Sequence, residues 1–204
     1  DSGAVRAQDA SVGYVAANST AEVVSGYTAF ILGVRSVAPE AVMRVRYTGS
    51  WSNYNEEKKQ AKILIDEGCV IIAQHVNTMA PAVACEEAAA AGRRVYHVGY
   101  HQSMMDVAPS SALVSIRTNW APYVIQAVQA VMNGREIEEA VEGNVHGNDM
   151  SAGFDAGWVE LLEMNRFVAA DGTEDKVGKT IEAMKKGRIK VFSGNYTGVN
   201  PMNP

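Results

Sequence analysis

The 204-residue sequence contains neither a long hydrophobic run nor a basic, apolar N-terminal segment. No apolar stretch approaches the roughly 18 residues needed to cross a bilayer, and residues 1–10 lack the composition of a signal peptide. Basic side chains are few, 18 against 23 acidic ones, for a net charge of −5. This balance argues against a nucleic-acid backbone or an anionic membrane surface as the main partner. We expect a soluble chain, any targeting segment already removed, that recognises a small neutral or weakly charged ligand.

Only two cysteines are present, Cys69 and Cys85, and no C-x-x-C spacing occurs. The missing spacing excludes a zinc ribbon or a thioredoxin-type redox site. Cys69 opens an apolar strand pattern and Cys85 lies in an alanine-rich helical pattern. We therefore predict two buried, unpaired thiols rather than a disulfide.

The sequence also lacks the common catalytic and phosphate-binding motifs: it has no G-x-S-x-G, G-x-x-x-x-G-K-[ST], H-E-x-x-H or G-x-G-x-x-G. Asp149 and Asp155 could pair, but in a glycine-rich stretch they more simply form turns. A metal held by His75 and His101 would need a third ligand, and Asp106 is the only acidic residue close by. We expect no catalytic residue, no metal site and no cofactor.

Short apolar runs alternate with longer helical patterns from Ser11 onward, which is typical of parallel β-α-β units. The expected strands are residues 12–16, 43–47, 70–73, 95–99 and 113–116. The expected helices between them are residues 20–37, 55–67 and 81–91. The sequence therefore predicts the α/β class, with a doubly wound parallel sheet in a three-layer α/β/α arrangement.

The pattern changes after Thr118. A helix over residues 121–132, with Pro122 in its first turn, precedes an expected strand near residues 141–145. A loop-rich stretch over residues 147–157, a helix over residues 173–186 and an edge strand at residues 190–192 complete the expected elements.

Four successive strand ends of the expected sheet carry polar or aromatic side chains that a plain connection would not require. Ligands of such sheets bind beyond the carboxyl ends of the strands, because loops converge there. The candidate ligand-binding residues at these ends are Asn18, Trp51, Gln74, His75, Asn77, Thr78, His101 and Gln102. The set is rich in amides, imidazoles and indole and poor in carboxylates, which suits recognition of a neutral molecule by hydrogen bonds and ring stacking.

These candidates also have purely structural interpretations. Asn18 can cap the helix that follows it, and Trp51 can pack as an aromatic at the edge of the lobe. A lone histidine is usually a hydrogen-bonded structural residue, but His75 and His101 stand at neighbouring strand ends, which favours ligand contact. Both interpretations stay open at this point.

Segments spread over nearly the whole chain carry a resemblance to a known family. They are Gly13–Val15, Gly26–Phe30, Gly33–Val37, Tyr47–Trp51, Ala73–His75, Val98–Met104, Leu113–Tyr123 and Lys185–Gly194. In this order they resemble the BMP (basic membrane protein) family of substrate-binding lipoproteins, which deliver purine nucleosides or nucleobases to ABC transporters. The resemblance implies a type I periplasmic-binding fold, in which two α/β lobes joined by three crossings close over a ligand.

The resemblance also implies a division of the chain. Residues 11–118 would form the ligand-binding second lobe, residues 119–147 would complete the first lobe, and residues 148–204 would return to the second. The chain would start at the first crossing, so the N-terminal lobe of a family member would be missing. The apolar face of the helix at residues 121–132 would then lack its usual partner and invite association.

Several family positions are altered in this sequence. Ala73 stands where nucleoside binders have an aromatic stacker, and Ala73–His75 resembles a branch associated with free nucleobases. His101 replaces an aspartate that holds the ribose, and the purine-contacting lysine is replaced near Thr118 and Asn119. The resemblance therefore favours an uncharged purine base such as adenine, or another small ring. Asn119 and Trp120 join the ligand-binding candidates.

By the same resemblance, the chain would capture its ligand by closure of the two lobes and deliver it to an ABC transporter permease. Its location would be extracytoplasmic, at the cell surface or in the periplasm. A lipid anchor outside this chain would be its sole attachment to the membrane. One alternative is the ligand-binding sensor domain of a signalling receptor. Another is a nucleoside-processing enzyme, which the scarcity of carboxylates at the strand ends disfavours.

Overall fold

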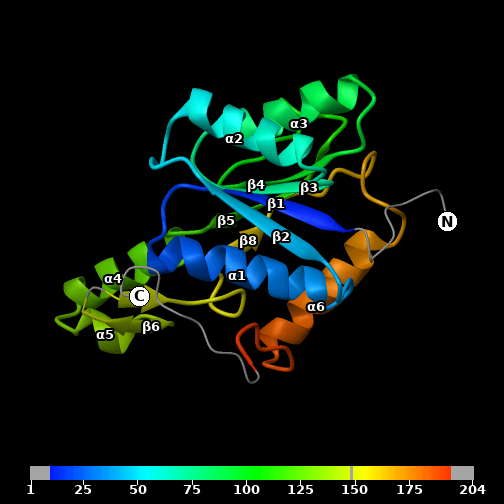
Figure 1. Cartoon of the computed structure of the whole chain (residues 1–204). Coiled ribbons are helices and arrows are strands. Elements are labelled where there is room, and N and C mark those ends of the chain that lie inside the picture. Colours follow the sequence, from blue (N-terminus) through cyan, green and yellow to red (C-terminus); the bar gives the residue numbers. More distant parts are fainter. Residues whose placement is uncertain (1–9, 148, 194–204) are drawn as a thin grey trace. The chain divides into compact units, whose positions relative to one another are not determined.

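A computed structural model describes residues 10–147 and 149–193, and its first part alternates strands with helices. The order is β1 (Ser11–Ala16), α1 (Ala21–Arg35), β2 (Val42–Tyr47), α2 (Tyr54–Asp66), β3 (Ile71–His75), α3 (Ala80–Ala90), β4 (Tyr96–Tyr100) and β5 (Ala112–Thr118). These strands lie in one sheet in the order β2-β1-β3-β4-β5, and β1 pairs with β2 and β3 in parallel, as β3 does with β4 (Figure 1). The predicted α/β class is confirmed.

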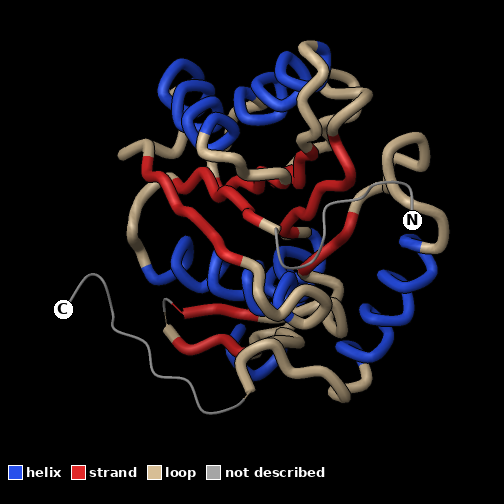
Figure 2. Tube along the Cα trace, turned by 45° about the vertical axis from the view of Figure 1, so that its right-hand side comes forward, coloured by secondary structure: helices blue, strands red, loops and turns tan. Residues whose placement is uncertain are grey.

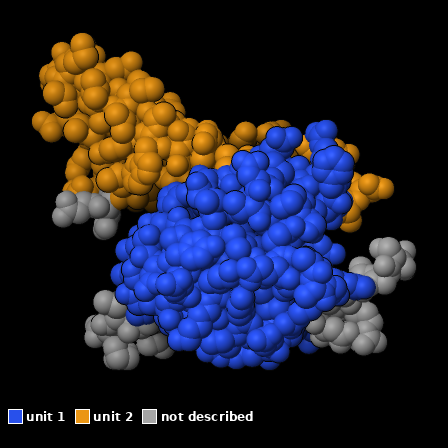
Figure 3. All heavy atoms as spheres, turned by 90° about the horizontal axis from the view of Figure 1, so that it is seen from above, with its two compact units in different colours: residues 1–115, 163–169, 191–204 blue, residues 116–162, 170–190 orange. Residues whose placement is uncertain are grey.

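The chain divides into two compact units (Figure 3). Among the described residues, unit 1 comprises residues 10–115, 163–169 and 191–193, and unit 2 comprises residues 116–147, 149–162 and 170–190. The division falls within β5, whose last residues belong to unit 2. The expected lobe limits at residues 118 and 147 remain a prediction.

Helices cover both faces of the sheet in unit 1, with α1 on one face and α2 and α3 on the other (Figures 1 and 2). On the α1 face, the rings of Tyr27 and Phe30 lie with their centroids 5.9 and 5.7 Å from the ring of Tyr14 in β1. Val23, Tyr27 and Phe30 recur at helical spacing, so one stripe of α1 faces the strands. This is the amphipathic pattern that the sequence predicts.

The opposite face of the sheet carries the larger core cluster. Val15 and Ile72 of the strands pack there with Leu64 of α2 and Cys85 of α3, all of them fully buried. A Cβ atom on Gly13 would lie 2.8 Å from Cδ1 of Ile72 and 3.0 Å from Cβ of Leu64. The close approach of α2 to β1 therefore requires glycine at this position.

Cys69 and Cys85 are both buried and unpaired. The Sγ atom of Cys69 lies 3.6 Å from the hydroxyl of Ser11. Burial raises the pKa of the Cys85 thiol, which keeps it protonated and unreactive. The prediction of two structural thiols is confirmed.

Unit 2 has its own small core and contains six further elements besides the end of β5. They are α4 (Ala121–Met132), α5 (Ile137–Ala140), β6 (Asn144–His146), β7 (Asp149–Ser151), β8 (Val159–Leu161) and α6 (Thr173–Lys185). Trp158 is buried with Val141 and Val145, and its ring centroid lies 5.3 Å from that of Tyr123 in α4. β6 and β7 form an antiparallel pair, and β8 runs antiparallel to the end of β5.

The sequence interpretation was wrong in two places in unit 2 and at its end. The stretch predicted as loop contains β7. The strand expected near residues 141–145 begins only at Asn144, because Val141 is the C-cap of the short helix α5. The edge strand expected at residues 190–192 is irregular chain followed by a turn. A strand needs a hydrogen-bonded neighbour, and the position beside β5 is taken by β8.

One side of α4 is apolar and exposed. The helix contains no charged residue, and only Ala130 is buried. Large apolar side chains at its start and along its outer side are at least half exposed: Trp120, Val124, Ile125, Val128, Val131 and Met132. We refer to these residues as the α4 apolar face. None of the helices in the described part of the chain is long and apolar enough to span a membrane.

Candidate ligand-binding site

The carboxyl ends of β1, β2, β3 and β4 lie at one edge of the sheet in unit 1. Ala16, the last residue of β1, is in register with Tyr47 of β2 and with His75 of β3. In a parallel sheet, the loops that follow these ends are brought together because all strands point the same way. The structure therefore gathers the loops that carry the unit 1 candidates.

Four aromatic rings form a continuous row across this edge. The ring centroids of Trp51 and His75 are 5.7 Å apart, those of His75 and Tyr100 are 4.5 Å apart, and those of Tyr100 and His101 are 3.7 Å apart. The rings come from the loop after β2, the end of β3 and the end of β4. We call these four residues the aromatic row. Three of them are sequence candidates that the fold brings into contact.

His75 is the most unusual member of the aromatic row. Its side chain is buried, yet neither ring nitrogen has a hydrogen-bond partner among the described residues. A Cβ atom on Gly26 of α1 would lie 2.7 Å from Nδ1, so this nitrogen faces the backbone of α1. The Nε2 atom lies 3.8 Å from a carboxylate oxygen of Glu22, which is beyond hydrogen-bond distance.

The His75 ring is neutral at physiological pH. Burial lowers its pKa from 6.5 to about 4, and the neighbouring His101 ring adds to the shift. A neutral imidazole carries one donor and one acceptor nitrogen. A buried polar group without a partner is costly, and such groups in native proteins call for an explanation such as a ligand or water.

His101 is held in a strained backbone conformation. Its φ is +68°, in the left-handed region, where it is the sole residue other than glycine in the described part of the chain. Non-glycine residues pay roughly 1–2 kcal/mol to adopt this conformation. The ring is exposed on the outside of the row, and partial burial lowers the pKa of His101, although Glu22 opposes the shift. Backbone strain of this kind often marks a functional site.

The remaining unit 1 candidates take structural or peripheral positions. Asn18 accepts a hydrogen bond of 3.0 Å from the backbone of Thr20, at the start of α1. Asn77 and Gln102 are exposed. The backbone N–H of Asn77 donates to the backbone carbonyl of Trp51 at 2.8 Å, and that of Gln102 donates to the backbone carbonyl of Tyr100 at 2.9 Å. Asn18 thus lies beside the site as a turn-forming residue.

Gln74 faces away from the aromatic row, on the α2 and α3 face. Its Nε2 donates to the carbonyls of Val76 and Thr78 at 2.8 and 2.9 Å. Its Oε1 lies 3.0 Å from Nε2 of the buried His97. Since Oε1 accepts only, His97 must donate from Nε2, and burial lowers the His97 pKa to about 3. Every polar atom of Gln74 is used inside unit 1.

Two residues of the site are not among the candidates chosen from the sequence. Tyr100 connects the rings of His75 and His101, and Glu22 supplies the carboxylate nearest to the row. Tyr100 could have been found from the alternation of side chains in β4, which puts Tyr100 on the same face of the sheet as Val98. Val98 packs against the core cluster on the α1 face. Glu22 follows the end of β1 but resembles an ordinary acidic residue in the first turn of a helix.

Asn119 and Trp120 belong to unit 2. The Asn119 amide donates to the carbonyl of Gly157 at 3.1 Å and to Glu160 at 2.9 Å, and its Oδ1 accepts from the backbone N–H of Ala121 at 3.2 Å. Trp120, which precedes α4, is 52% exposed. Asn119 has an internal structural role, whereas Trp120 is about half exposed.

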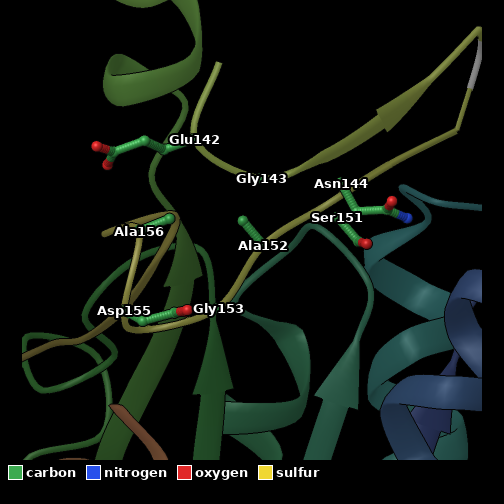
Figure 4. A pocket seen from close by; sticks show the side chains of 8 residues that line it. All are labelled: Glu142, Gly143, Asn144, Ser151, Ala152, Gly153, Asp155 and Ala156. Carbon is green, nitrogen blue, oxygen red and sulfur yellow. The ribbon is translucent and has the colours of Figure 1, made fainter. Parts of the chain in front are cut away.

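An open pocket of about 510 Å³ lies within unit 2. Its lining is Glu142, Gly143, Asn144, Ser151, Ala152, Gly153, Asp155 and Ala156 (Figure 4). The side chain of Glu142 points away from those of Asn144 and Ser151 (Figure 4). The lining holds no aromatic ring, so it offers no stacking surface. The part of the chain that the structure describes contains no cluster of three side chains suited to a metal ion.

A family model described as "ABC transporter substrate-binding protein PnrA-like" (Bmp) matches residues 3–191. A purine-binding protein of Brucella abortus is 34% identical over 183 residues, 89% of this chain and 47% of the relative. A protein of Haloferax volcanii, provisionally named as an ABC transporter glucose-binding protein, is 30% identical over 184 residues, 90% of this chain and 43% of the relative. The chain spans less than half the length of these two curated relatives.

Solved structures of similar fold include a solute-binding protein of an ABC transporter system from Conexibacter woesei. It has a TM-score of 0.65 at 16% identity, over 88% of this chain and 56% of that one. A transcriptional activator of the comK gene from Bacillus halodurans has a TM-score of 0.67 at 20% identity, over 91% of this chain and 59% of that one. At these identities the likeness concerns the fold alone.

Proposed function

We propose that this chain, which belongs to the Bmp family of PnrA-like ABC transporter substrate-binding proteins, supplies most of one ligand-binding lobe of such a protein. The intact protein would capture a small molecule outside the cytoplasm and present it to the permease of an ABC transporter. The family is one of binding proteins rather than enzymes. A lipid anchor outside this chain would hold the protein at the membrane.

The observation that carries this proposal is the aromatic row with an unpartnered, neutral His75 at its centre. Trp51, which is partly buried against both core clusters, and the exposed His101 offer aromatic surface on which a flat molecule can stack. The lowered pKa of His75 removes positive charge from the row, and no lysine or arginine belongs to it. An uncharged, planar ligand with hydrogen-bonding groups fits this chemistry.

A purine base is the ligand that we favour. The Brucella abortus relative is named a purine-binding protein. In this chain, the Glu22 carboxylate, which is 65% exposed and lies 3.8 Å from Nε2 of His75, can accept from a ring or exocyclic N–H of a base. A sugar, suggested by the name of the Haloferax volcanii relative, would more often be held by several amides and carboxylates. The side-chain amides of Gln74 and Asn119 are already used internally.

The N-terminal lobe would come from the rest of the intact protein. The α4 apolar face exposes six large apolar side chains, which is costly in water and typical of a surface that another part of a protein covers. We propose that the N-terminal lobe expected from the family packs on this face. Ligand capture would then follow from closure, because a ligand that contacts both lobes binds the closed state more tightly than the open one.

Calorimetry on the intact protein tests this function. Adenine, adenosine and glucose are titrated separately, after mass spectrometry of small molecules released from the denatured protein. We expect adenine to bind more tightly than glucose, and Trp51→Ala to weaken adenine binding. Tight glucose binding with no response to adenine would reject the purine assignment. The absence of binding by all three, with no released molecule, would count against a transport role for the aromatic row.

A further inference from the structure

A buried carboxylate joins two loops at the edge of the sheet where the aromatic row lies. Glu57, in the first turn of α2, is completely buried. Its Oε1 accepts from the backbone N–H of Asn53 at 2.9 Å. Its Oε2 accepts from the backbone N–H of Thr78 at 3.2 Å and from the Thr78 hydroxyl. The loop after β2 and the loop after β3 are thus tied to one side chain.

The hydrogen bonds of Glu57 go beyond an ordinary helix cap. Asn53 caps α2 by accepting from the backbone N–H of Glu56, and Glu57 accepts from the backbone N–H of Asn53, one position later than in a capping box. A cap needs only that one return bond. The second oxygen of Glu57 reaches 21 residues along the chain to Thr78, whose hydroxyl in turn accepts from the backbone of Ala80 at the start of α3.

The two tied loops are also the ones that hold the edge of the aromatic row. The carbonyl of Trp51 accepts from the backbone N–H of Asn77 at 2.8 Å. Trp51 stands two residues before Asn53, and Asn77 directly precedes Thr78. The side-chain amide of Gln74 also holds the loop after β3, by donating to the carbonyls of Val76 and Thr78. None of these bonds uses a side-chain atom of the aromatic row.

We propose that Glu57 is a positioning residue that holds the Trp51 ring against His75 by locking these two loops together. This inference rests on the proposed function, because positioning matters only if the aromatic row binds a ligand. The chemistry requires a carboxylate: Glu57 faces three donors and no acceptor, and an ionised carboxylate is the side chain that only accepts. A glutamine of the same size would turn its NH₂ group toward one of these donors.

The test compares Glu57→Gln with Glu56→Gln. The second variant makes the same chemical change one residue earlier, at a side chain that bonds to Lys59 and Gln60 on the surface. Both variants are labelled with 5-fluorotryptophan, so that the three tryptophans give three ¹⁹F signals. Trp120 and Trp158, in unit 2, serve as internal references for Trp51. Amide hydrogen exchange is followed at Asn53, Asn77 and Thr78, with Val15 in β1 as reference.

We expect Glu57→Gln to shift or broaden the Trp51 signal and to leave the other two unchanged. Exchange at Asn53, Asn77 and Thr78 should become about tenfold faster, and adenine should bind to the intact protein about tenfold more weakly, as for the loss of a hydrogen bond to a charged group. Glu56→Gln should change none of these. An unchanged Trp51 signal in Glu57→Gln, with amide exchange as in Glu56→Gln, would overturn the proposal.

Two further arms keep the test decisive. If Glu57→Gln fails to fold, Thr78→Val replaces it, because valine removes the hydroxyl donor and keeps the backbone N–H. Thr78→Ser restores the hydroxyl and should restore the wild-type Trp51 signal and affinity. If Trp51 moves but adenine affinity stays the same, Glu57 holds the ring in place, and its role in ligand binding is rejected. If the wild-type protein binds no adenine, the proposed ligand fails, while the Trp51 signal still decides whether Glu57 positions that ring.

Discussion

Gln74 and His75 are neighbours in β3 and are buried to nearly the same extent, 4% and 7% exposed, but their side chains differ in hydrogen bonding. Gln74 points to the α2 and α3 face and satisfies its amide completely. His75 points to the α1 face and leaves both ring nitrogens without a partner. Gln74 is thus part of the hydrogen-bonded framework of unit 1, whereas the ring nitrogens of His75 are buried without a partner among the described residues, which calls for an explanation.

The largest effect should be the loss of stability when the hydrogen bonds of Gln74 are removed. Gln74→Leu keeps the volume but leaves Nε2 of His97 and the carbonyls of Val76 and Thr78 without their partner. We expect the free energy of unfolding to fall by about 2–4 kcal/mol in urea titrations. Gln102→Leu makes the same change at an exposed strand end and should cost less than about 0.5 kcal/mol. Equal losses of unfolding free energy in the two variants would show that the hydrogen bonds of Gln74 do not stabilise unit 1.

The next effect should be the loss of adenine affinity when the Trp51 ring is removed. Trp51→Ala should weaken adenine binding to the intact protein by about 1–3 kcal/mol, the usual worth of one stacked ring, when measured by calorimetry. Trp51→Phe keeps an aromatic ring and should retain most of the affinity. Trp120→Ala provides the comparison with unit 2. If that variant loses the affinity and Trp51→Ala does not, stacking belongs to Trp120 and the aromatic row is not the main contact.

Acid should destabilise the fold through the buried, neutral His75. Its folded pKa of about 4 lies below the unfolded value of 6.5, so the unfolded chain binds more protons between these pH values. Stability contributed by neutral His75 is present above pH 6.5 and is lost as the pH falls toward 4, by up to about 1.4 kcal/mol per pH unit. His97 acts in the same direction, with a folded pKa of about 3.

The variant His75→Phe isolates this contribution. Urea titrations from pH 4.5 to 7.5 should give a shallower fall in unfolding free energy for His75→Phe than for the wild type. The ionisable groups near His75 are Glu22, Tyr14, Tyr100 and His101. A double variant with Glu22→Gln therefore serves as the control. Parallel pH curves for His75→Phe and the wild type would show that His75 is not held neutral by the fold.

The smallest effect is the stability of His75→Phe at pH 7.5. Phenylalanine fills a similar space without unpaired nitrogens, so the unfolding free energy should change by less than about 1 kcal/mol or rise slightly. The same variant should nonetheless lose adenine affinity. A fall in stability as large as that of Gln74→Leu would mean that His75 has a structural partner after all.

Much of this arrangement could be predicted from the sequence, and the exceptions have physical causes. The alternation of apolar runs and helical patterns predicts β1 to β5 and α1 to α4 within a few residues. It also places Trp51, His75 and His101 at strand ends, where the structure brings their rings together. Whether Gln74 or His75 faces α1 depends on the face of the sheet, and a one-residue change in register would reverse it.

The elements of unit 2 are harder to predict because they are short. β6, β7 and β8 have three residues each, too few for a period-two pattern to stand out. Tyr100 and Glu22 were missed for a different reason. Their roles depend on which chain segments meet at the edge of the sheet, and residue types alone do not reveal such contacts.

The most direct measurement of the central claim is ¹⁵N NMR of the imidazole rings in the intact protein, with and without adenine. The chain has four histidines, and His75→Phe assigns the signal of interest. We expect His75 to show the nitrogen shifts of a neutral ring at pH 6 and at least one of its nitrogens to move as adenine saturates the protein. His97, paired with Gln74, should not move. Adenine binding that leaves both His75 nitrogens unchanged, or a His75 ring that is protonated at pH 6, would contradict the account.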